Sequence, residues 1–302
     1  MQKGVRWLVD QVLLKVLGTA QDGGHPQLNC QCSHCQAARA DSSLKRLQSS
    51  LGLLDKEEAK SFIFDASPAF SEQLDNLNEL AQKNKFKTDH LSGILITHAH
   101  LGHYTGLLYL GKEALNSFQM PVYLSQKMLV FLKNNAPWSD LFKNNNLKAE
   151  IFDFNKEYSL TKNINFKALA INHRNENADT AGFLVMTTGK AFFYLPDLDK
   201  WQGFEKRFRE ILAKVDYVFL DGTFFDKKEL GELRGRDLNE VPHPPIIETI
   251  ALFSDLSKAE KAKFHFTHFN HTNRILDLDA KKAEYVENHG FKLLKKAQEF
   301  SL

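Results

Sequence analysis

The chain has 302 residues, of which 43% are hydrophobic and 25% are charged, a balance typical of a globular protein with a sizeable core. Lysine and arginine total 39 against 37 aspartate and glutamate residues, so the net charge is only +2. This near-neutral balance gives no electrostatic reason to expect nucleic acid or a membrane surface as the main partner. No apolar run approaches the roughly 18 residues that a membrane span needs.

The N-terminal residues bear on where the protein works. Lys3 and Arg6 precede the apolar Trp7-Leu8-Val9, as in a signal peptide, but Asp10 interrupts the run and no small-residue cleavage site follows cleanly. We therefore expect a cytoplasmic protein, with a processed secretory or periplasmic form as the alternative.

Apolar periodicity predicts strands and helices in alternation along the chain. Strands are predicted over 13–18, 49–54, 61–65, 93–96, 121–124, 164–171, 181–186, 191–195, 217–220 and 264–267. One helix is predicted to begin at residues 66–68, and others are predicted over 107–115, 126–133, 204–214, 246–253 and 280–288. There is no internal repeat and no low-complexity linker. The pattern favours a layered α/β architecture in a single domain spanning residues 1–302.

Three histidines follow a short apolar run near residue 95. Residues 93–96 predict a buried strand, and His98, His100 and His103 come directly after it, within six residues. The apolar pattern resumes at Leu107, so we place the histidines on a strand-to-helix loop, where a rigid scaffold can aim them into a cleft. Because neutral imidazole is the commonest protein ligand for zinc, the spacing favours a metal site over three surface histidines.

Other predicted strands also end in residues that can bind a metal. His173, Asp197 and His268 each follow the end of a predicted strand. Taken singly, each would more often be a cap or a hydrogen-bonded loop residue. Together with the three histidines above, they offer nitrogen and oxygen ligands suited to zinc, manganese or iron.

The only cysteines of the chain are Cys30, Cys32 and Cys35. An odd, tightly spaced set cannot form an ordinary disulfide framework, and it favours a metal clip. Three thiolates are one ligand short of a closed tetrahedral zinc site. The candidates for the fourth position are His25, His34 and His271. The alternative is a reduced cluster without metal, which would be costly to keep unoxidised.

The stretch His98-Ala99-His100-Leu101-Gly102-His103 resembles the His-x-His-x-Asp-His signature of the metallo-β-lactamase superfamily. The resemblance implies the four-layered αβ/βα sandwich of that fold, which periodicity alone would not select. It also implies a role for each ligand candidate: a first metal bound by His98, His100 and His173, a second bound by His103 and His268, and Asp197 bridging the two.

Gly102 departs from the signature, because it stands where the superfamily has the aspartate. Glycine has no side chain, so we expect a second metal that binds weakly, is absent, or is completed by water. Gly102 alternatively permits a close approach of the backbone. Since the superfamily aspartate often orients the attacking water, its loss also argues against an ordinary dinuclear mechanism. If the missing carboxylate weakens the site, then Gly102→Asp should restore the second metal.

Further motifs, spread over nearly the whole chain, are similar to those of the PqqB family. They are residues 18–24, the cysteine cluster, and residues 48–50, 65–68, 221–223 and 268–273. The related PhnP phosphodiesterases share the cysteines and a C-terminal His-x-x-His whose second histidine completes a structural zinc. His271 is the matching position, so the resemblance implies a zinc clip of Cys30, Cys32, Cys35 and His271. PqqB proteins usually lack the His-x-His pair and keep the Asp-His, whereas this chain does the opposite.

His243 lies between Pro242 and Pro244, ahead of a predicted helix. Its position resembles that of a substrate-side histidine in phosphodiesterases of the superfamily, which implies a general acid or a phosphate contact. A loop histidine without a catalytic role is the alternative.

Three functions are compatible with these residues. The first is metal-dependent hydrolysis of a phosphodiester-like bond in a small molecule, in which metal lowers the pKa of water toward about 7 and His243 protonates the leaving group. The second, implied by the PqqB resemblance, is an iron- and oxygen-dependent hydroxylation in the synthesis of pyrroloquinoline quinone. The third is a non-catalytic, zinc-stapled binding protein. A homodimer is an open alternative to a monomer.

Overall fold

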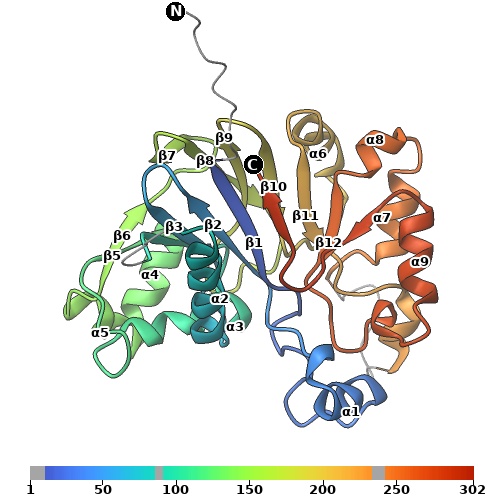
Figure 1. Cartoon of the computed structure of the whole chain (residues 1–302), viewed down its shortest axis with the longest axis horizontal. Coiled ribbons are helices and arrows are strands. Elements are labelled where there is room, and N and C mark those ends of the chain that lie inside the picture. Colours follow the sequence, from blue (N-terminus) through green and yellow to red (C-terminus); the bar gives the residue numbers. More distant parts are fainter. Residues whose placement is uncertain (1–10, 86–90, 233–241) are drawn as a thin grey trace, which may run out of the picture.

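The computed structural model of the chain describes residues 11–85, 91–232 and 242–302 (Figure 1). Residues 1–10, which raise the question of a signal peptide, lie outside these ranges. Within them, the strands form two seven-stranded sheets.

The first sheet consists, in spatial order, of β14 (Glu299–Ser301), β1 (Val12–Gly18), β2 (Ser50–Asp55), β3 (Lys60–Phe64), β4 (Gly93–Leu95), β5 (Met120–Leu124) and β6 (Leu147–Ile151). The second consists of β13 (Lys292–Leu293), β12 (Phe264–Thr267), β11 (Tyr217–Asp221), β10 (Ala191–Leu195), β9 (Thr180–Thr187), β8 (Ile164–Ile171) and β7 (Glu157–Thr161). The α-helices are α1 (Ser33–Ala40), α2 (Phe70–Lys83), α3 (Leu101–Tyr104), α4 (Gln126–Asn134), α5 (Trp138–Lys143), α6 (Glu205–Leu212), α7 (Ile246–Leu252), α8 (Lys258–Lys261) and α9 (Lys281–Asn288). Short 3₁₀ helices are η1 (Ser42–Leu44), η2 (Thr105–Leu110), η3 (Lys227–Glu232) and η4 (Arg274–Leu276).

Most strands are buried on both faces, because each sheet is covered on both sides; the edge strands β6 and β7 are the exception. In β1, Val12, Leu14 and Val16 belong to the core between the two sheets. Leu13 and Leu17 point the other way, into the core under the helices. Successive strand residues face opposite sides of a sheet, so a doubly covered strand is apolar almost throughout; the one charged residue of β1, Lys15, donates to the carbonyl of Asn76.

Aromatic side chains fill the space between the sheets. Phe64 of β3 meets Phe183, Phe192 and Tyr194 of the second sheet edge-on, with ring centroids 5.7 to 5.8 Å apart. Edge-to-face contact is a favoured arrangement of aromatic rings, and each of these four rings is almost wholly buried. The abundant phenylalanines of the sequence are divided mainly between this inner layer and the outer cluster of the second sheet.

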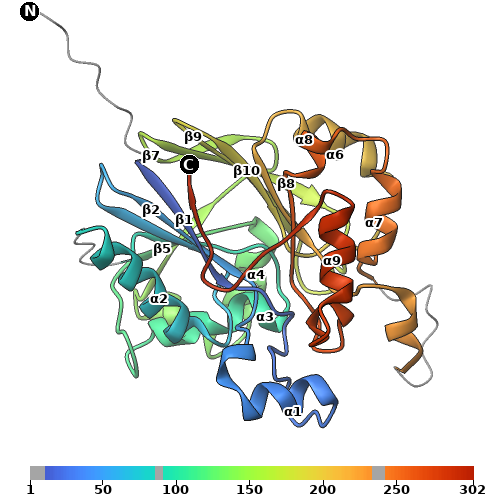
Figure 2. The same ribbon diagram turned by 45° about the vertical axis from the view of Figure 1, so that its right-hand side comes forward.

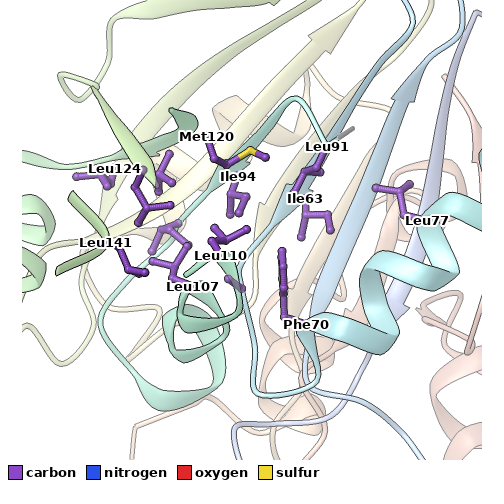
Figure 3. Close-up of a cluster of buried hydrophobic side chains, with 14 of the residues drawn as sticks. Ile63, Phe70, Leu77, Leu91, Ile94, Leu107, Leu110, Met120, Leu124 and Leu141 are labelled. Atoms are coloured by element: carbon purple, nitrogen blue, oxygen red, sulfur yellow. The ribbon is translucent and has the colours of Figure 1, made fainter. Parts of the chain in front are cut away.

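Helices cover the outer face of each sheet (Figures 1 and 2). On the first sheet, Phe70 and Leu77 of α2 pack in one cluster with Ile63 of β3 (Figure 3). On the second, Phe208 of α6 and Ile250 of α7 belong to the corresponding outer cluster. The layer order is therefore helix, sheet, sheet, helix, which confirms the predicted four-layered αβ/βα sandwich. No helix of the described ranges is both long and apolar enough to cross a bilayer.

The segment after the histidines differs from the prediction. Instead of one helix over 107–115, the chain forms α3 and η2, which together end at Leu110. Gly106 lets η2 pack closely against the segment after β3. Its backbone N–H donates to the carbonyl of Ala66 at 2.8 Å, and a Cβ there would lie 2.2 Å from the carbonyl oxygen of Ser67. His103 lies within α3, whereas we predicted that it lies on a loop.

Candidate metal centre

The predicted catalytic ligands meet at one edge of the sandwich, beyond the carboxyl ends of strands. His98 and His100 follow β4, His173 follows β8, Asp197 follows β10 and His268 follows β12. β3 and β4 run parallel, as do β10, β11 and β12. Carboxyl ends of parallel strands are where open α/β sheets bind ligands.

His98, His100, His173 and Asp197 form the first group, with ligand atoms that all lie within 4.8 Å of one another. His173 Nε2 is 3.2 Å from His100 Nδ1 and 3.6 Å from Asp197 Oδ1. His98 Nε2 is 3.9 Å from Asp197 Oδ2. Two donor atoms that share one zinc at about 2.1 Å are about 3.0–3.4 Å apart, so the shortest of these distances fits a shared cation and the other two would have to shorten slightly.

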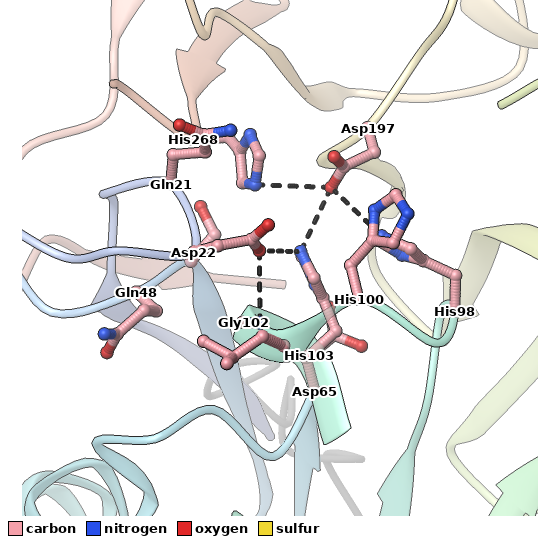
Figure 4. Close-up of polar contacts among 12 residues, drawn as sticks. Gln21, Asp22, Gln48, Asp65, His98, His100, Gly102, His103, Asp197 and His268 are labelled. Carbon is pink, nitrogen blue, oxygen red and sulfur yellow. Dashed lines mark hydrogen bonds and ion pairs between the residues drawn. The ribbon is translucent and has the colours of Figure 1, made fainter. Parts of the chain in front are cut away.

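The second group lies on the other side of Asp197 (Figure 4). His103 Nε2 is 3.2 Å and His268 Nε2 is 3.4 Å from Asp197 Oδ2. Asp197 therefore lies between the two histidine groups, within 4 Å of a nitrogen in each.

Asp22 also faces the second group, and our sequence analysis did not identify it. Its Oδ1 atom is 3.4 Å from His103 Nε2. In the sequence, Asp22 is distinguished only as an acidic residue in the loop after the first strand, within the family motif of residues 18–24.

Several converging atoms are buried and have no hydrogen-bond partner. They are His98 Nε2, His103 Nε2, His268 Nε2 and Asp197 Oδ2. Buried polar atoms without a partner are rare and costly, so a cluster of them needs an explanation. Imidazole nitrogens around a carboxylate oxygen are a donor set that fits zinc, manganese or iron.

Asp65, which follows β3, orients two of these imidazoles. Its Oδ2 accepts a hydrogen bond from His103 Nδ1 at 2.7 Å, and its Oδ1 accepts from the backbone N and the hydroxyl of Thr97, each at 2.8 Å. Because the Thr97 hydroxyl donates to Asp65, it accepts from His98 Nδ1 at 2.9 Å. Both rings are thereby held through Nδ1, with Nε2 turned toward the site. Asp65 and Thr97 thus act as outer-sphere partners do when they orient metal-binding histidines.

The second sheet repeats this arrangement from the end of β11. Asp221 Oδ2 accepts from His243 Nδ1 at 2.7 Å, and Asp221 Oδ1 accepts from the Thr223 hydroxyl at 2.7 Å. The Thr223 hydroxyl in turn accepts from His268 Nδ1 at 2.9 Å. Each sheet thus contributes an Asp-Thr-His relay and a second histidine bonded directly to the same aspartate.

The charges of the site are strongly coupled. Burial lowers the pKa of His103, but the carboxylates of Asp65 and Asp197 outweigh it and raise that pKa well above its ordinary value. Burial likewise opposes the charge on His243, yet Asp221, and then Asp197, raise its pKa to about 9. The carboxylates therefore create a negative potential at this edge, which suits a cation as well as a proton.

The cysteine cluster forms a separate group beside α1, which lies at the end of the sandwich (Figures 1 and 2). The sulfur atoms of Cys30, Cys32 and Cys35 are each 3.5 Å from His271 Nδ1. A tetrahedral zinc with Zn–S near 2.3 Å and Zn–N near 2.0–2.1 Å separates S and N by about 3.5 Å. The four residues that the resemblance implied are thus brought together at a spacing that fits zinc.

The other two candidates for the fourth clip position make different contacts. His34 Nε2 lies 2.8 Å from Asp277 Oδ1, and His34 Nδ1 lies 3.0 Å from the carbonyl oxygen of His271. His25 Nδ1 lies 3.1 Å from the carbonyl oxygen of Leu44. Neither ring belongs to the group formed by the three sulfur atoms and His271.

Comparison with known proteins agrees with this architecture. A model of the "Beta-lactamase superfamily domain" matches residues 60–269, well over half of the chain. "Coenzyme PQQ synthesis protein B" of Ectopseudomonas mendocina (strain ymp) is 25% identical over 304 residues, covering 93% of this chain and 96% of the relative. The protein of the same name from Methylobacillus flagellatus is 26% identical over 295 residues, covering 91% and 94%.

Two solved structures share the fold. Zinc-bound PqqB from Methylobacterium extorquens superposes with a TM-score of 0.77 at 20% identity, covering 96% of this chain and 100% of that one. A diphosphatase of the PhnP family superposes with a TM-score of 0.66 at 19% identity, covering 96% of each chain. The chain therefore belongs to the beta-lactamase superfamily, has the metallo-β-lactamase fold, and resembles PqqB over nearly its whole length.

Proposed function

We propose that this protein is a metal-dependent hydrolase that cleaves a phosphodiester-like bond in a small molecule. The observation that carries the proposal is the convergence of two imidazole groups on Asp197, with buried, unpartnered nitrogens facing its carboxylate. A metal held there would supply a water of lowered pKa and would polarise the scissile phosphoryl group. Membership of the superfamily supports this class of reaction, and the fold shared with a diphosphatase is consistent with it.

The residues of the chain divide this task between them. His98, His100 and His173 would hold a first cation, and His103 and His268 a second, with Asp197 shared. Zinc, manganese or iron would suit these ligands. Asp65 and Asp221 fix the rings beforehand, so that little reorganisation is needed when the substrate arrives.

His243 is the proposed general acid. Asp221 holds its Nδ1, which leaves Nε2 as the nitrogen that can reach a leaving group. The carboxylate of Asp221, which accepts from Nδ1, favours the protonated imidazole and raises its pKa, as a proton donor requires.

We expect His243→Gln to lower kcat by about 10²–10⁴, the usual contribution of a general acid. The loss should be large for phosphodiesters with alkoxide leaving groups and small for those with nitrophenolate, which departs without a proton. Metal content should not change. The exposed histidine at the end of α9 provides the control, since His289→Gln should behave as the unmodified protein. Equal losses for both leaving groups, or loss of a metal, would show that His243 has another role.

A second candidate is a PqqB-like, oxygen-dependent role in the synthesis of pyrroloquinoline quinone. Similarity to PQQ synthesis proteins over more than 90% of the chain favours it. Such chemistry would want iron with open coordination positions. A non-catalytic, zinc-stapled binding protein is less well supported, because the relays from Asp65 and Asp221 orient rings that a mere binding surface would not need.

Metal analysis combined with two activity assays tests the proposed function. Purified protein should contain zinc or manganese beyond the clip and should hydrolyse bis(p-nitrophenyl) phosphate and small phosphodiesters. Chelation should abolish the turnover, and adding zinc or manganese back should restore it. Iron with oxygen consumption would instead favour the second candidate, and no turnover with any of these metals would favour the third.

A further inference from the structure

We propose that Asp22 is a ligand of the second metal and replaces, from another part of the chain, the aspartate that the histidine motif lacks. Asp22 and Gly102 then act as a pair, in which Gly102 leaves the space and Asp22 supplies the carboxylate that fills it. The inference rests on the proposed metal centre, but not on the reaction catalysed there.

The space beside Gly102 is filled by Asp22 (Figure 4). A Cβ atom at Gly102 would lie 2.2 Å from Asp22 Oδ1 and 2.8 Å from Asp22 Cα. The backbone N–H of Gly102 donates to the same Oδ1 at 3.1 Å. Gly102 lies within α3, where any residue can adopt the backbone conformation, so it is lack of space that requires glycine here.

Asp22 also faces the right partners. Asp22, His103 and His268 offer ligand atoms within 4.8 Å of one another, and the Nε2 atoms of both histidines are buried without a hydrogen-bond partner. With the shared Asp197, the second site would have two imidazoles and two carboxylates, a set suited to a hard or borderline cation. On this assignment the second site does not lack a carboxylate, contrary to the expectation from Gly102, because the oxygen comes from the loop after β1.

The loop that carries Asp22 is fixed to the loop that carries His268. The backbone N–H of Gln21 donates to the carbonyl of Phe269 at 2.9 Å, and Asn270 Nδ2 donates to Gln21 Oε1 at 2.6 Å. A turn closed by a hydrogen bond from Gly24 N to Gln21 O, at 2.8 Å, sets the direction of Asp22. The carboxylate is thus positioned by a rigid scaffold, as a metal ligand should be.

The first experiment removes the charge of Asp22 and keeps its shape. Asp22→Asn retains an oxygen for Gly102 N–H but is a poorer ligand. Calorimetric titration with Mn²⁺, on protein stripped of catalytic metal but keeping its clip zinc, should show two tight sites in the unmodified protein. In Asp22→Asn the second should weaken by at least about tenfold, since even outer-sphere partners are worth that much. Asp179→Asn is the matched control, because Asp179 pairs with Lys127 outside the site.

The second experiment moves the carboxylate back to the histidine motif. Gly102→Asp alone would put two carboxylates into one space, so we expect a lower melting temperature and no gain of manganese. In the double variant Asp22→Gly with Gly102→Asp the space is free. Most of the manganese affinity that Asp22→Gly alone loses should then return.

Three results would overturn the proposal. In the first, Asp22→Asn binds both manganese ions as tightly as the unmodified protein. In the second, Gly102→Asp folds normally and binds the second ion more tightly; in the third, the double variant folds but does not recover manganese affinity. A melting curve in excess chelator identifies variants that fail to fold. If Gly102→Asp or the double variant fails to fold, the manganese affinity of Asp22→Asn tests the proposal. None of these measurements uses a substrate. A protein that binds two manganese ions through Asp22 but hydrolyses nothing would refute the proposed reaction and leave the ligand assignment standing.

Discussion

Replacing both His98 and His100 with alanine should abolish hydrolysis while the protein remains folded. The change removes two of the three imidazoles of the first group and leaves only His173 and Asp197, too few to retain a metal. Metal catalysis supplies several kcal/mol of transition-state stabilisation, and each ~1.36 kcal/mol is tenfold in rate, so we expect a loss of at least about 10³-fold. Metal analysis should show the catalytic ion lost and the clip zinc retained.

The stability of the same variant distinguishes a catalytic from a structural role. In the metal-free protein His98 Nε2 is buried without a partner, and relief of that cost should offset much of the loss of the Nδ1 bond to Thr97 and of the packing of the ring. The melting temperature in chelator should therefore stay close to that of the unmodified protein. The rise in melting temperature on adding metal should be reduced, because fewer ions would stabilise the folded state. A protein that no longer folds would instead show that the two histidines are structural.

Replacing Cys32 with serine should have the largest effect on stability. The clip joins Cys32 to His271, 239 residues away, so a zinc ion there would tie the start of the chain to its end. Structural zinc contributes directly to folding free energy. If several kcal/mol are lost, and each ~1 kcal/mol lowers the melting temperature by about 2–4 °C, we expect a fall of roughly 10 °C. The zinc content should fall by one equivalent.

The matched control for the clip is the neighbouring residue. Ser33→Ala changes the first residue of α1 without touching the sulfur cluster and should leave both zinc content and melting nearly unchanged. If Cys32→Ser kept its full metal content and melted normally, the clip assignment would be wrong.

The sequence predicts those parts of the fold and site that depend on local pattern. Apolar runs predict the strands because both faces of each sheet are buried. Residues such as His98, Asp197 and His268 could be singled out because they stand at strand ends, and the carboxyl ends of parallel strands meet at one edge. The assignment of these residues to two metals required the resemblance to a known superfamily.

Asp22 and the two relays could not be predicted in this way, because each depends on residues far apart in the chain. Asp22 and Gly102 are 80 residues apart, and only the folded protein shows that one fills the space beside the other. Asp65 likewise reaches Thr97 across 32 residues before it can orient His98. A glycine in a metal motif indicates a missing side chain, but it does not reveal what fills the vacated space.

The clip also has a consequence for the order in which metals are acquired. The loop after β1 carries both Asp22 and Cys30, and the loop after β12 carries both His268 and His271. A zinc ion in the clip would fix the distance between these loops, so it would raise the affinity of the second catalytic site, and reciprocally. Thiolates prefer zinc to harder cations such as manganese, so the clip should load first. Manganese would then bind the second site more weakly in protein whose clip is empty.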